Sequence, residues 1–112
     1  MLVNISGNQM YVSDALKQFA KAELSRVLEN YLDTSYVNVV LSMDKKEHVA
    51  VGNMVFLGEE IQASSRTDDM YRSIVAMSAE LEQRLAKRRE LVKSHPNVKL
   101  LFEQNETGAR PH

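Results

Sequence analysis

The stretch DDMYRSIVAMSAELEQRLAKRRELVK, residues 68–93, decides how the chain folds, because it places a long helical pattern directly after strand-like sequence. Its apolar residues recur at spacings of three, four and seven, as on one face of an α-helix: Ile74, Met77, Leu81, Leu85 and Val92. Asp68 and Asp69 stand at the expected N-terminus, where acids cap a helix and favour its dipole. Pro96 ends the pattern, since proline cannot continue a helix.

The end of this helix is strongly basic, although the chain as a whole is nearly neutral. Positions 84–93 hold five basic residues and one acid, Glu90, whereas the formal net charge is −1. Five cations exceed what the helix dipole requires, and their mutual repulsion favours a nearby anion. The cluster therefore indicates a polyanion partner such as RNA or DNA. From periodicity alone, a solvated basic helix end is an equally good interpretation.

Three strand-like runs precede the helix. They span residues 37–44, 49–57 and 60–65, with expected turns at Lys45-Lys46-Glu47 and Gly58-Glu59. The residues expected to share one face in each run are Val37, Val39, Leu41 and Met43, then Gly52, Met54 and Phe56, then Ile61 and Ala63. Short turns between such runs predict an antiparallel meander.

A short strand and a first helix stand before the meander. Leu2 to Ser6 alternates, and Ser13 is the expected N-cap of a helix ending near Leu32-Asp33. The apolar stripe of this helix is Leu16, Ala20, Leu24, Val27, Leu28 and Tyr31. The order β-α-β-β-β-α predicts an α+β two-layer sandwich, with two helices on one face of a four-stranded sheet. Residues 1–93 are expected to form this domain, and residues 94–112 a flexible C-terminal tail.

Enzymatic chemistry has little support. The chain has no cysteine, which excludes disulfides, cysteine-ligated zinc and thiol catalysis and suits a reducing cytoplasm. His48, His95 and His112 are scattered, and no phosphate-loop motif occurs. No apolar run approaches the roughly 20 residues that span a bilayer. We therefore expect a cytoplasmic, monomeric binding protein without catalytic residues, metal, cofactor, small-molecule substrate or membrane contact.

The candidate RNA-contacting residues are basic side chains of both predicted helices. If both helices cover one sheet face, their cations form a basic strip on the helical layer, a shape suited to phosphate backbones. Few exposed aromatic residues interleave with these charges, so base stacking on the plan of an RNA recognition motif is not supported. The set is Lys17, Lys21, Arg26, Arg84, Lys87, Arg88 and Arg89.

Five short segments carry a resemblance to a known family. They are Asn4-Ile5-Ser6-Gly7, Ser13-Asp14-Ala15-Leu16, Val39-Val40-Leu41-Ser42, Ile61-Gln62-Ala63-Ser64-Ser65 and Asp69-Met70-Tyr71. In their order and spacing the chain resembles the ribosome hibernation promoting factors, also called the protein Y or ribosome-associated inhibitor family, over roughly residues 2–93. The Asp-Met-Tyr segment is the most specific of these signatures.

The resemblance implies a fold similar to a double-stranded RNA-binding domain. It also implies binding to ribosomal RNA of the small subunit, in the channel for mRNA and tRNA, through basic residues of the two helices. Such occupancy blocks translation during stationary phase or stress without catalysis. Glu23, Glu80 and Gln83 depart from the family, which usually has basic residues at these positions.

The 19 residues after Lys93 are too few for the dimerisation domain of long family members, so the chain resembles a short form. Some short forms help ribosomes pair, while others have a longer tail and hold ribosomes as inactive monomers; the tail here resembles the second type in length. An alternative function is a protein–protein interaction module that uses the open sheet face or the tail around Val98 to Phe102.

Overall fold

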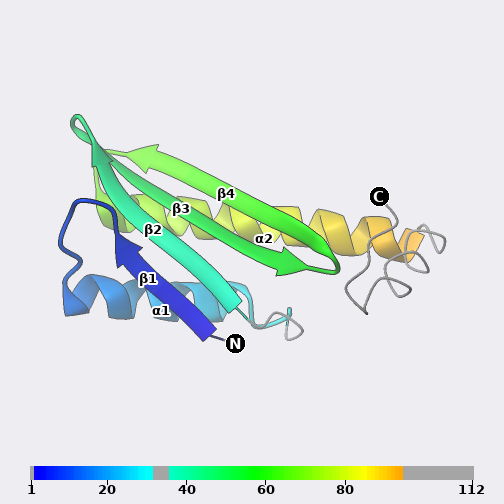
Figure 1. Ribbon diagram of the computed structural model, residues 1–112. Coiled ribbons are helices and arrows are strands. Elements are labelled where there is room, and N and C mark those ends of the chain that lie inside the picture. The colour runs from blue at the N-terminus through cyan, green and yellow to red at the C-terminus, as the bar shows by residue number, and fades with distance from the viewer. Residues whose placement is uncertain (1, 32–35, 95–112) are drawn as a thin grey trace.

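The elements follow the predicted order in the computed structural model, which describes residues 2–31 and 36–94 (Figure 1). They are β1 (Leu2–Gly7), α1 (Asp14–Val27), β2 (Tyr36–Asp44), β3 (Glu47–Phe56), β4 (Glu59–Thr67) and α2 (Met70–Ser94). The strands lie side by side in chain order; β1 pairs parallel with β2, and the other pairs are antiparallel. Both helices lie on one face of the sheet. The predicted α+β two-layer sandwich is confirmed.

The core lies between the sheet and the two helices. The predicted stripes of α1 and α2 are buried, as are the inward residues of the strands, from Val37 on β2 to Ala63 on β4. Met43 is the exception: 45% of it is exposed, because it lies beside the β2–β3 turn at the end of the sheet. The open face of the sheet carries the alternate residues of each strand.

The first helix is shorter than predicted. It ends at Val27 and not near Leu32-Asp33, the latter being outside the described residues. The backbone N–H of Tyr31 donates to the carbonyl of Leu28, three positions earlier, which closes a four-residue turn instead of a further α-helical turn. Arg89 of α2 donates to the Asn30 carbonyl at 3.1 Å, and its guanidinium lies 4.3 Å from the Tyr31 ring centroid. These contacts from α2 fix the chain in a conformation that leaves the helix.

The β3–β4 turn lies one residue earlier than predicted. Phe56 pairs with Glu59, so the loop consists of Leu57 and Gly58, with φ values of 50° and 80°. Positive φ at both central residues is the preferred geometry for a two-residue hairpin, and it is unusual for leucine. Arg88 of α2 donates a hydrogen bond to the Leu57 carbonyl and stabilises this backbone.

Gly52 lets α2 approach the sheet closely. A Cβ atom at this position would lie 2.7 Å from the Sδ atom of Met77. We expect Gly52→Ala to lower the free energy of unfolding by about 1 kcal/mol, because the methionine must move in a packed core. Urea denaturation measures this change. In a Met77→Ala background the same substitution should cost less, and an equal cost in both backgrounds would contradict the close contact.

Candidate nucleic-acid interface

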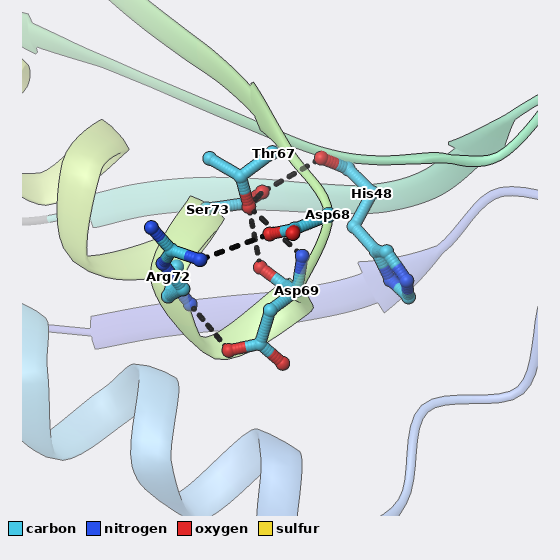
Figure 2. Close-up of polar contacts among 6 residues, drawn as sticks. All are labelled: His48, Thr67, Asp68, Asp69, Arg72 and Ser73. Carbon is cyan, nitrogen blue, oxygen red and sulfur yellow. Dashed lines mark hydrogen bonds and ion pairs between the residues drawn. The ribbon is translucent and has the colours of Figure 1, made fainter.

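A hydrogen-bonded network holds the N-terminus of α2 to the ends of β3 and β4 (Figure 2). Asp69 caps the helix. Its carboxylate accepts a hydrogen bond from the backbone N–H of Arg72 at 3.3 Å, and its backbone carbonyl accepts one from the backbone N–H of Ser73. The Ser73 hydroxyl donates to the His48 carbonyl at 2.7 Å and lies 2.7 Å from the hydroxyl of Thr67. The network fixes the rotation of α2 about its own axis, and therefore the direction in which the side chains further along the helix point.

Arg84, Lys87 and Arg88 lie on the flank of α2 that faces β4. With Glu59, Glu60, Ile61, Gln62 and Leu91 they line a groove of about 250 Å³. Arg84 donates through Nε and Nη2 to one carboxylate oxygen of Glu80, at 3.1 and 2.7 Å. Lys87 is exposed and makes no ion pair within the described residues. An ion pair this exposed contributes little to stability, so the Arg84 guanidinium is able to exchange Glu80 for another anion.

Arg88 is bound to the protein itself. Its side chain is 13% exposed, and it lies 3.3 Å from the carboxylate of Glu59. Its Nη2 atom donates to the Leu57 carbonyl at 2.8 Å. Arg89 is similarly engaged at the end of α1. Both residues therefore have a structural role that the sequence did not reveal.

Arg26 lies two helical turns after Phe19, which contacts Tyr71, and therefore on the side of α1 that faces α2. It donates to the Glu23 carboxylate at 2.7 Å. The hydrogen bond and the negative charge of Glu23 raise the pKa of Arg26 above its ordinary value, because both favour the charged guanidinium. Glu23 thus partly neutralises the nearest cation of α1.

Lys17 and Lys21 are exposed on the opposite side of α1. Phe19 contacts Tyr71 of α2, with ring centroids 4.9 Å apart, so it marks the side of α1 that faces α2. Successive residues of a helix are rotated by about 100°, and residues two positions from Phe19 therefore point away from α2. The structure brings Arg84, Lys87 and Arg88 together but leaves these two lysines on the far flank. The basic strip expected across the helical layer is divided.

Sequence reasoning missed the surface between the basic flanks. Ala76 and Ala79 are exposed on α2, together with Tyr71 and Val75. The sequence signal that could have found this surface is a row of small and apolar residues at helical spacing, on the face opposite the buried stripe. Together with Phe19 and Arg72, these residues line a hollow between α1 and α2.

Within residues 2–31 and 36–94, no group of three His, Cys, Asp or Glu side chains is arranged to hold a metal ion. Neither described helix is long and apolar enough to cross a membrane.

Residues 3–93 match the family described as Sigma 54 modulation protein / S30EA ribosomal protein. The chain belongs to this family. A ribosome hibernation promoting factor of Escherichia coli (strain K12) is 34% identical over 96 residues, which are 85% of this chain and 100% of that relative. One of Azotobacter vinelandii is 30% identical over 90 residues, 80% of this chain and 84% of that relative. The resemblance found in the sequence is confirmed.

Solved structures support the same fold. A ribosomal subunit interface protein from Coxiella burnetii superposes with a TM-score of 0.76 at 23% identity, covering 80% of this chain and 99% of that one. The N-terminal domain of Thermus thermophilus Protein Y gives a TM-score of 0.69 at 22% identity, covering 78% and 98%. At this identity the likeness concerns the fold alone.

Proposed function

We propose that the protein is a ribosome hibernation factor that binds ribosomal RNA of the small subunit, in the channel for mRNA and tRNA. The similarity to ribosome hibernation promoting factors over the whole length of the Escherichia coli relative carries this proposal. Occupancy of the channel blocks translation by steric exclusion during stationary phase or stress, and no reaction is catalysed. Such a role places the protein, a monomer when free, in the cytoplasm with the ribosomes.

The exposed cations of the helical layer support backbone contact. Arg84 and Lys87 line one flank, and Lys17 and Lys21 extend from the other. Two separated basic flanks suit phosphates of a folded RNA better than a single extended strand, because folded RNA presents phosphates on both sides of a groove.

Sedimentation with purified ribosomal subunits tests the proposal. At about 50 mM salt the protein should migrate with the small subunit, and at about 200 mM its affinity should fall roughly 100-fold if four phosphates are contacted. The large subunit alone serves as the control and should leave the protein at the top of the gradient. Failure to migrate with the small subunit at low salt contradicts the proposal.

One observation favours the alternative function, a protein–protein module. Leu2, Tyr36 and Val55 are exposed large residues on the open face of three neighbouring strands, and Leu2 pairs with Tyr36. Docking on this face would hardly respond to salt, since apolar burial is not screened. Salt-insensitive ribosome binding would therefore favour the sheet face. The tail around Val98 to Phe102, the other half of this alternative, lies outside the described residues.

A further inference from the structure

An open hollow of about 400 Å³ lies between α1 and α2, away from the sheet. Carbon atoms form almost all of its lining, which comes from Phe19, Tyr71, Arg72, Val75, Ala76 and Ala79. Tyr71 and Val75 are each 41% exposed, which is a large exposed fraction for side chains of this size and apolar character. The alanines at 76 and 79 make the hollow, because longer side chains at either position would fill it.

Aromatic packing makes the hollow rigid at one end. The rings of Phe19 and Tyr71 are 4.9 Å apart at an interplanar angle of 71°, an edge-to-face contact that joins α1 to α2. Tyr71 also follows directly after Met70, whose buried side chain begins α2. The tyrosine is therefore held in place before any ligand arrives, which lowers the entropy lost on binding.

A cation stands at the rim of the hollow. Arg72 is 71% exposed and donates to the carboxylate of Asp68 at 3.0 Å, while Asp68 is 82% exposed. An ion pair this exposed is weak, so the guanidinium is able to exchange its partner for another anion. An open apolar hollow with an arginine at its rim matches the chemistry of a nucleotide, which has a planar base and an attached phosphate.

The size of the hollow argues against a protein partner. A stable protein–protein interface uses about 20–30 residues on each side, whereas six residues line this surface. The next turn of α2 carries Glu82 and Gln83, so the apolar area does not continue along the helix. The hollow is large enough for one planar group, but its area is too small for a stable contact with a protein surface.

We propose that this hollow binds one unstacked base of small-subunit ribosomal RNA. The base lies against Tyr71, Val75 and the two alanines, and Arg72 contacts a neighbouring phosphate. The inference rests on the proposed function, and it adds a base-contacting site between the two basic flanks. Every base has an apolar face, so this contact strengthens binding without selecting a sequence by itself.

Filling the hollow tests the proposal. Ala76→Leu with Ala79→Leu leaves the charge unchanged and suits an exposed helix, because leucine is a good helix former. We expect the affinity for the small subunit to fall about 5- to 150-fold, the range for losing one stacked base. The dependence of affinity on salt should not change. Arg72→Gln should instead reduce the slope of log affinity against log salt by about 0.7–0.9.

Two further measurements separate the outcomes. Ala86→Leu, on the same helix but outside the hollow, is the matched control and should bind like the unaltered protein. Chemical probing of the ribosomal RNA should show a base that the unaltered protein protects and the filled variant exposes. Unchanged affinity of the filled variant overturns the base site, and so does weaker binding without a newly exposed base, which indicates a protein contact. If the unaltered protein itself does not bind the small subunit, the proposed function fails first.

Discussion

Reversing two charges on the β4 flank of α2, by Arg84→Glu with Lys87→Glu, should remove ribosome binding and leave the domain folded. Both side chains are exposed, and Arg84 is 54% exposed in its pair with Glu80. Losing that pair costs a few tenths of a kcal/mol. Losing two phosphate contacts and gaining two repulsive charges should lower the affinity at least about 100-fold at low salt. Co-sedimentation measures binding, and thermal unfolding confirms the fold.

Two variants control for net charge. Lys45→Glu with Lys46→Glu changes the charge equally at the β2–β3 turn, and binding should be largely retained. Glu80→Gln removes the carboxylate that competes for Arg84 and should tighten binding. Equal losses for both double variants would mean that total charge, not this flank, determines affinity. A folded Arg84/Lys87 variant that binds normally would exclude the flank from the interface.

The fold was predictable because its determinants are local. The stripe from Ile74 to Val92 and the alternation on β2 each follow from the period of a single element, and burial of those positions depends little on which neighbour covers them. The end of α1 was not predictable in this way. It depends on Arg89, which donates to Asn30 from 59 positions further along the chain.

The candidate site was predictable in composition but not in geometry. Arg84 and Arg88 are the same residue type one helical turn apart, and sequence spacing treats them alike. Their roles differ because Leu57 and Glu59, on the β3–β4 hairpin, happen to lie within reach of Arg88. Likewise, whether Lys17 points toward α2 or away from it is known only once α1 is placed beside α2. Long-range contacts of this kind decide which cations remain exposed for the proposed contact with RNA.

Arg88→Glu should therefore differ from Arg84→Glu and lower the free energy of unfolding by about 2–3 kcal/mol. The substitution leaves the Leu57 carbonyl without its donor and places a second carboxylate beside Glu59. The exposure of Glu59, 55%, keeps the effect below that of a fully buried pair. Arg84→Glu is the matched control and should change stability by less than about 0.5 kcal/mol, with urea denaturation as the measurement. If both variants prove equally stable, Arg88 does not hold the hairpin turn and becomes available for phosphate contact like Arg84.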